Sequence, residues 1–175
     1  MTDPVDVIGA ALGSLVGALL AIHRPDRVRR LLMCAVAADM AGPTRAYVSE
    51  RAAKVRVVGM RGVVEASLAN SFPATHPTQR AAYQAIYLGN DPAAYAELSL
   101  ALARLEMTAA DWRAIRAPTL VASGAHDFLW PPEIGQQVAD LIPGATFAVM
   151  EDAGHFPHLQ APETLIGLAR GFLGE

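Results

Sequence analysis

The chain has 175 residues, a length that suits one folded domain with a substantial core. Its 14 basic and 17 acidic residues give a formal charge of -3 and are scattered along the sequence, which argues against nucleic acid as a partner. The single cysteine, Cys34, excludes an internal disulfide framework and a Cys/His zinc cluster. We therefore expect a cytoplasmic protein without a metal or other cofactor.

The first apolar stretch, residues 5–22, is predicted to be a buried strand that leads into a buried helix. It contains three glycines and Asp6, and it is preceded by the acidic Asp3 rather than by Lys or Arg. These features argue against a signal peptide or a membrane span. The strand is expected over residues 5–8 and the helix over 12–22, where His23-Arg24-Pro25 ends it.

Three later runs, at residues 31–36, 119–123 and 146–150, are continuously apolar and bounded by turn residues or charges. This pattern predicts buried parallel strands. A helix is expected to open at Pro131-Pro132-Glu133, and a closing helix over residues 162–172. The apolar face of that closing helix is predicted to consist of Leu165, Ile166, Leu168, Ala169 and Phe172. Alternating strands and helices indicate an α/β fold with a parallel sheet.

The middle of the chain carries no strand pattern. Ala-rich, helix-favouring pieces at residues 44–58, 62–69, 78–87 and 93–106 are separated by Gly62, Phe72-Pro73 and Gly89-Asn90-Asp91-Pro92. A helical insertion between two strands of one sheet is typical of a lid. We therefore predict a core formed by residues 1–42 and 114–175 and a helical lid, or cap, formed by residues 43–113.

The turn after the first strand resembles the nucleophile elbow of α/β-hydrolases, G-x-S-x-G, because Gly9 and Gly13 have the required spacing. A side chain in place of either glycine is expected to collide with the neighbouring strand or helix. The nucleophile position itself holds Ala11, whose methyl group cannot attack a carbonyl. Three later segments match the family in order: residues 23–28 before the second strand, residues 117–127 ending in Asp127, and residues 152–157 around His155.

This resemblance implies the C-terminal half of an α/β-hydrolase: the last four parallel strands of its sheet and the helical lid. It assigns Asp127 to the triad acid, His155 to the base and the N–H of Leu12 to one oxyanion donor. In the family the second oxyanion donor follows an early strand, for which this sequence has no counterpart. The residues expected to line the substrate pocket are Phe128, Trp130 and Phe156.

Four further polar residues near these motifs are given structural or peripheral roles. Ser14 follows the elbow on the helix and is expected to point away from the site, so it is rejected as a substitute nucleophile. Cys34 is interpreted as a small buried residue rather than a thiolate. His126 and His158 have no motif position and are expected to be exposed or to line the pocket.

The lid and its flanks, especially residues 89–95, are most similar to 3-oxoadipate enol-lactonases. The elbow is also similar to aminoacrylate or carbamate hydrolases. These resemblances imply a hydrolase of small esters, lactones, or enamine- or carbamate-like substrates. Three interpretations remain open: direct activation of water by His155 and Asp127, a non-catalytic binding or scaffold protein whose pocket also includes Leu129, and an inactivated or truncated fragment of a serine hydrolase.

Family members carry four strands, on the order of a hundred residues, before the elbow strand. The strand from Val5 to Ile8 is therefore expected to form an exposed apolar edge of the half sheet. Such edges tend to pair with other chains. We predict that a second copy of the chain, giving a homodimer or another homo-oligomer, or a separate N-terminal half, docks on this edge.

Overall fold

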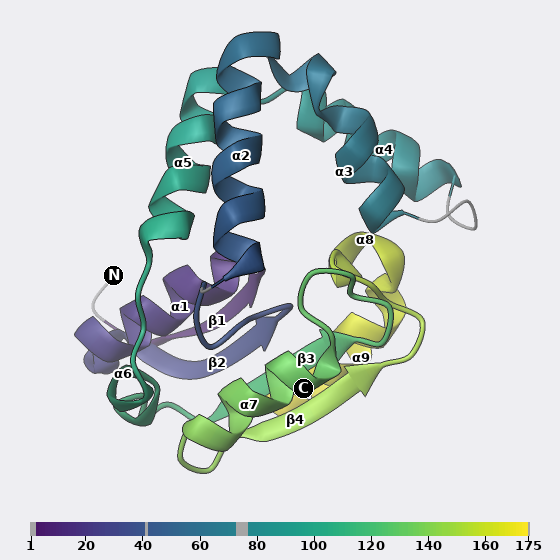
Figure 1. Cartoon of the computed structure of the whole chain (residues 1–175). Helices are drawn as coiled ribbons and strands as arrows, with labels where there is room; N and C mark the ends of the chain where they lie inside the picture. Colours follow the sequence, from purple (N-terminus) through teal and green to yellow (C-terminus); the bar gives the residue numbers. More distant parts are fainter. Residues whose placement is uncertain (1–2, 41, 73–76, 175) are drawn as a thin grey trace. The chain divides into compact units, whose positions relative to one another are not determined.

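The computed structural model describes residues 3–40, 42–72 and 77–174 of the chain. Two compact units are present (Figure 1). One consists of residues 1–38 and 107–175 and contains the sheet, and the other consists of residues 39–106 and is helical in its described part. No helix in the described ranges is both long and apolar enough to cross a membrane.

The sheet contains four parallel strands in the order β1-β2-β3-β4. Their bounds are β1 Val5–Ala10, β2 Val28–Cys34, β3 Thr119–Gly124 and β4 Thr146–Met150. This arrangement confirms the predicted half sheet of four neighbouring parallel strands. Because all four run in the same direction, their carboxyl ends meet at one edge of the sheet, and the loops that follow β1, β3 and β4 are brought together there.

Strand β2 differs from its predicted bounds, residues 31–36, at both ends. It begins at Val28, because the charged Arg29 and Arg30 can be accommodated within the strand. Their side chains reach solvent and form ion pairs with Asp6 of β1. It ends at Cys34 because Ala35 adopts a positive φ of 49°. Charges at the strand start had concealed the true beginning of β2 in the sequence.

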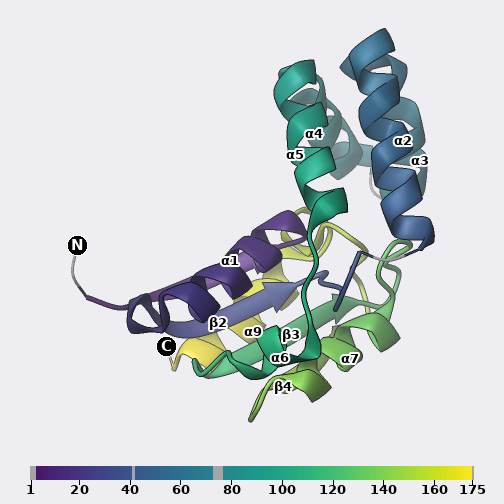
Figure 2. The ribbon, with the colours of Figure 1, turned by 60° about the vertical axis from the view of Figure 1, so that its left-hand side comes forward.

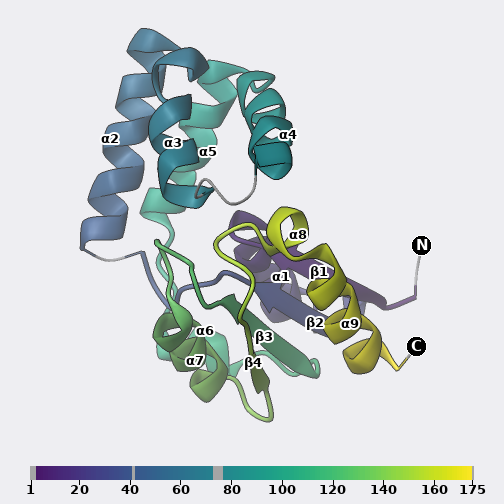
Figure 3. The ribbon, with the colours of Figure 1, turned by 90° about the vertical axis from the view of Figure 1, so that its right-hand side faces the viewer.

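Helices cover both faces of the sheet (Figures 2 and 3). Helices α1 and α7 pack on one face, whereas α9 packs on the other. The short elements η1, α6 and α8 were not predicted, because each spans one turn and carries no periodic apolar pattern. The bounds in this unit are α1 Leu12–His23, η1 Pro25–Arg27, α6 Ala109–Arg113, α7 Pro132–Leu141, α8 Pro157–Gln160 and α9 Pro162–Leu173.

The face of the sheet under α9 forms an apolar core. Four of the five residues predicted for the inner face of α9 pack against it, namely Leu165, Leu168, Ala169 and Phe172. The fifth, Ile166, was predicted wrongly, since it is 44% exposed. The four inward positions follow the i, i+3, i+4, i+7 spacing of one helix face, and Ile166 lies about 100° away around the helix axis.

The second unit consists of helices in its described part, residues 39–40, 42–72 and 77–106, and no strand occurs there. Helix α2 lies alongside α5, and α3 contacts α4 (Figure 1). The predicted break at Pro73 lies outside the described residues. The bounds are α2 Pro43–Val58, η2 Met60–Gly62, α3 Val64–Ser71, α4 Pro77–Leu88 and α5 Pro92–Arg104.

Candidate active site

The elbow lies between β1 and α1, at the carboxyl edge of the sheet. Ala11 has φ 49° and ψ -117°, a conformation that costs a non-glycine residue about 1–3 kcal/mol. Its N–H donates to the carbonyl of Cys34 at 2.9 Å, and its carbonyl accepts the N–H of Ser14 at 3.0 Å. These bonds hold the strained turn in place although the position carries only a methyl group.

The two glycines of the elbow differ in their surroundings. A Cβ on Gly9 would lie 2.5 Å from the carbonyl carbon of Gly13, so the predicted collision is confirmed there. The same prediction was wrong for Gly13, because a Cβ there would meet no atom of the described residues within 4 Å. Gly13 is the second residue of α1 and is exposed.

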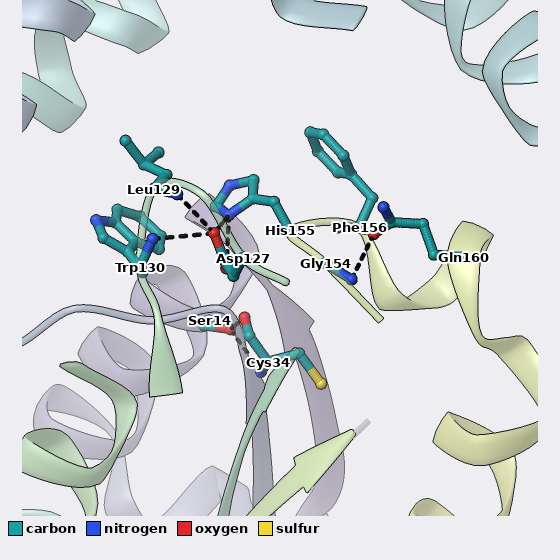
Figure 4. Close-up of polar contacts among 9 residues, drawn as sticks. All are labelled: Ser14, Cys34, Asp127, Leu129, Trp130, Gly154, His155, Phe156 and Gln160. Atoms are coloured by element: carbon teal, nitrogen blue, oxygen red, sulfur yellow. Dashed lines mark hydrogen bonds and ion pairs between the residues drawn. The ribbon is translucent and has the colours of Figure 1, made fainter. Parts of the chain in front are cut away.

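Leu12 and Ser14 open helix α1. Leu12 is the first helical residue, so its N–H belongs to the first turn, whose donors have no acceptor within the helix. Ser14 is buried, and its hydroxyl donates to the carbonyl of Cys34 at 2.7 Å and accepts the Cys34 N–H at 3.0 Å (Figure 4). The Ser14 hydroxyl therefore links α1 to the backbone of β2. These bonds agree with the prediction that Ser14 points away from the site.

Asp127 and His155 form a buried pair on the loops after β3 and β4 (Figure 4). The His155 Nδ1 lies 3.0 and 2.9 Å from the two carboxylate oxygens of Asp127, and the two side chains are 7% and 0% exposed. The Asp127 Oδ1 also accepts the N–H groups of Leu129 and Trp130, both at 2.9 Å. These backbone donors orient the carboxylate. Because a carboxylate only accepts hydrogen bonds, the contact assigns the proton of the neutral imidazole to Nδ1.

Aromatic rings surround the His155 imidazole. The rings of Phe128, Trp130 and Phe156 contact it edge-on, at centroid distances of 5.9, 5.2 and 5.0 Å. Trp130 is buried and its indole N–H has no hydrogen-bond partner in the described part of the chain, whereas Phe128 is exposed. The three residues predicted to line the pocket thus lie around the His155 imidazole.

The loops that carry Asp127 and His155 are tied together by backbone contacts. A Cβ on Gly124 would lie 2.6 Å from the carbonyl oxygen of Ala153, so glycine is needed for the two loops to approach. The His126 N–H donates to the same Ala153 carbonyl at 2.9 Å. This close approach brings the acid and the base within hydrogen-bond distance although they are 28 residues apart.

Gln160 is a residue that sequence reasoning missed. Its Oε1 accepts the N–H groups of Gly154 at 3.0 Å and Phe156 at 2.9 Å, the residues on either side of His155 (Figure 4). Gln160 itself is 8% exposed. A glutamine five residues after a motif histidine carries no signal of its own, because only the fold of the loop turns its amide back towards the backbone.

The remaining polar residues near the site have peripheral surroundings. Burial raises the pKa of the Cys34 thiol to about 12, so Cys34 is a buried thiol at neutral pH, as predicted. His126 and His158 are exposed. The ring of His158 is nevertheless partly covered, and this burial, together with the nearby His155, lowers the pKa of His158. Across the described ranges, no group of three or more His, Cys, Asp or Glu residues could hold a metal ion.

Comparison with known proteins gives this arrangement a family. The sequence model of the family described as the α/β hydrolase fold matches residues 2–162 of this chain. A pimeloyl-[acyl-carrier protein] methyl ester esterase of Neisseria meningitidis is 26% identical over 188 residues, which cover 97% of this chain and 70% of that protein. The protein named carbamate hydrolase RutD of Variovorax paradoxus is 30% identical over 159 residues, 88% of this chain and 60% of its own length.

Solved structures show the same similarity in three dimensions. The enol-lactonase from Burkholderia xenovorans has a TM-score of 0.91 and 27% sequence identity, and the match covers 99% of this chain and 67% of that one. The present chain therefore spans about two thirds of the length of this solved relative. The extent of the family match, together with the parallel sheet and the elbow, shows that the chain belongs to the α/β-hydrolase fold family.

Proposed function

We propose that this chain hydrolyses small, reactive esters or lactones by general-base activation of water. The buried His155–Asp127 pair is the observation that carries the proposal. With the proton held on Nδ1, the Nε2 of His155 is the nitrogen that can accept a proton. Water takes the place of the serine hydroxyl, because Ala11 leaves only a methyl group at the elbow.

The proposed step balances without a covalent enzyme intermediate. His155 Nε2 takes a proton from water while the water oxygen bonds to the substrate carbonyl carbon. The resulting oxyanion accepts the N–H of Leu12, and Asp127 stabilises the imidazolium. The tetrahedral species then expels the alkoxide, which takes the proton from His155. The products are an acid and an alcohol, or one hydroxy acid from a lactone.

The expected loss of catalytic rate without a serine nucleophile restricts the class of substrate. Serine hydrolases lose roughly 10⁴- to 10⁶-fold in kcat when members of the triad are removed. Only a substrate that already reacts readily with water can then show useful turnover. The relatives are named for a methyl ester, an enol-lactone and a carbamate, and activated members of these classes, such as enol-lactones, are therefore the substrates we expect.

The test compares two histidine variants on a panel of aryl esters and small lactones. We expect saturable turnover in the unmodified chain, a loss of about 10²-fold or more in His155→Ala, and little change in His126→Ala. His126 is a matched control because it lies on the Asp127 loop but is exposed. Absence of turnover across the panel, or equal turnover in His155→Ala, would contradict the proposal.

The methyl group of Ala11 favours a second candidate, a non-catalytic ligand-binding protein. In that case a ligand raises the melting temperature, and His155→Ala leaves the affinity for that ligand nearly unchanged.

The variant Ala11→Ser tests a third candidate, a recently disabled serine hydrolase. We expect it to raise ester turnover by about 10²-fold if the acid, base and elbow still work as a unit, since the N–H of Leu12 is the one oxyanion donor identified.

A further inference from the structure

The helical unit contains a cavity that the proposed reaction does not use. It has a volume of about 180 Å³ and lies between helices α2 and α3. Its lining includes Tyr47, Glu50, Arg51 and Lys54 of α2 and Ala66 and Ser67 of α3. All of these residues belong to the same compact unit, so the cavity is defined within that unit alone.

Arg51 is the unusual member of this lining. Its guanidinium lies over two aromatic rings, 5.0 Å from the centroid of Tyr47 and 5.6 Å from that of Tyr95. Its Nε–H is buried and has no hydrogen-bond partner among the residues that the structure describes. A buried cationic donor without an acceptor is costly, which makes the position a candidate for an anionic ligand.

Protein carboxylates do not balance the charge of Arg51 in the described part of the helical unit. Glu65 pairs with Arg80, Glu97 with Arg56 and Glu106 with Arg45, and none of the ion pairs found among these residues includes Arg51. Glu50 lines the cavity, but it is exposed.

Phenolates do not balance the charge either. Burial raises the pKa of Tyr83 and of Tyr95 above the ordinary range, so both phenols are neutral at physiological pH. The aromatic rings offer Arg51 the weaker attraction of their π faces, and this leaves its N–H donors available to an oxyanion.

Hydroxyl groups provide further donors at the cavity wall. Ser67 donates to the hydroxyl of Tyr87 at 3.0 Å, and Tyr87 donates to that of Tyr95 at 3.0 Å. Each hydroxyl can rotate, so the direction of this chain can reverse. Ser67, the member that lines the cavity, would then donate to a bound anion, with Tyr87 donating to Ser67 and Tyr95 to Tyr87.

We propose that this cavity binds a small organic carboxylate. The Arg51 guanidinium presents the planar fork that a carboxylate accepts, and Ser67 supplies a second donor. Lys54, exposed at the rim, adds positive charge, and Ala66 provides apolar wall for a short hydrocarbon tail. The volume equals that of about six water molecules in the liquid, which suits an acid of a few carbon atoms.

The test uses the full chain with butyrate as the probe and sodium chloride at equal ionic strength as the reference. We expect a saturable rise in melting temperature, about 5 °C at a hundredfold excess over Kd, and a downfield shift of the Arg51 Nε–H proton resonance. Inorganic phosphate is expected to bind more weakly than butyrate, because it has no hydrocarbon tail.

Three variants separate binding from a structural role. In Arg51→Met the butyrate response should disappear, while the melting temperature without butyrate is unchanged or higher, because an unpaired buried charge is removed. Arg51→Lys keeps the charge but loses the fork, and should weaken binding at least about tenfold. Arg104→Met, at an exposed residue of α5, is the matched control and should respond like the unmodified chain.

Three results would overturn the proposal. The first is an equal butyrate response in Arg51→Met. The second is an unmodified chain whose Arg51 Nε–H resonance does not move with butyrate, a reading that does not depend on the folding of any variant. The third is saturable binding of phosphate without binding of butyrate. None of these measurements involves ester hydrolysis, so they are independent of the proposed activity.

Discussion

Gly9 and Gly13 flank Ala11 symmetrically in the sequence, yet they face different surroundings. A Cβ at Gly9 would overlap the backbone of Gly13 and Ser14, whereas a Cβ at Gly13 would meet none of the described atoms. We expect Gly9→Ala to lower the free energy of unfolding by about 3 kcal/mol or more, because backbone atoms cannot move aside as a flexible side chain can. Urea unfolding followed by circular dichroism measures the change.

Gly13→Ala is the matched control for this prediction. Gly13 lies in the first turn of α1, where alanine is favoured over glycine by up to about 1 kcal/mol. We therefore expect equal or slightly higher stability for Gly13→Ala. Equal losses in the two variants would mean that the elbow tolerates neither side chain and that the contrast between the two glycines does not hold.

At the scale of elements, the loop between β4 and α8 presents His155, and one amide oxygen fastens it. Gln160 accepts two N–H groups from the residues that flank His155. Gln160→Met keeps the volume but removes the acceptor, leaving two N–H groups without their acceptor. We expect a loss of about 1–3 kcal/mol in stability and faster hydrogen exchange of the Gly154 and Phe156 amides, measured by NMR.

Gln160→Glu separates the role of the acceptor from that of packing. Its carboxylate can accept the same two N–H groups, so we expect their exchange to remain slow. If Gln160→Met left both amides as protected as in the unmodified chain, another group would have to be their acceptor.

At the scale of the whole chain, the described sheet has an exposed apolar edge. Val5 and Ile8 of β1 are 43% and 50% exposed, and Val16 and Leu20 of α1 are also exposed. Because an open strand edge offers unpaired backbone groups to another chain, we predict self-association through β1. Light scattering at micromolar concentration should give a mass above that of one chain.

A charge at this edge should disrupt the association. We expect Ile8→Lys to reduce the mass towards that of one chain, whereas Val57→Lys, at an 84% exposed residue of α2, should not. A fully soluble chain with the mass of a monomer would contradict the prediction. The solved enol-lactonase relative is longer than this chain. The alternative predicted from the sequence is that a separate N-terminal half docks on the same edge. In that case the mass rises only when that half is added.

The sequence by itself determined the order of the strands and of the longer helices, and the loops that carry the motif residues. Continuous apolar runs between turn residues predicted the four strands, since burial on both faces of a parallel sheet selects such runs. The spacing around Gly9, Asp127 and His155 was sufficient for the α/β-hydrolase resemblance, because a sharp elbow and two loop positions each need particular residues. Lid function and the catalytic roles of these residues remain predictions.

Only the tertiary structure decided which side chains meet. The strained backbone of Ala11, the two bonds from Gln160 and the aromatic surroundings of Arg51 all depend on residues that are distant in the sequence or on the exact path of a loop. The difference between Gly9 and Gly13 has the same origin. Local patterns specify which elements form, whereas contacts across elements are set by packing, for which a single sequence carries no periodic signal.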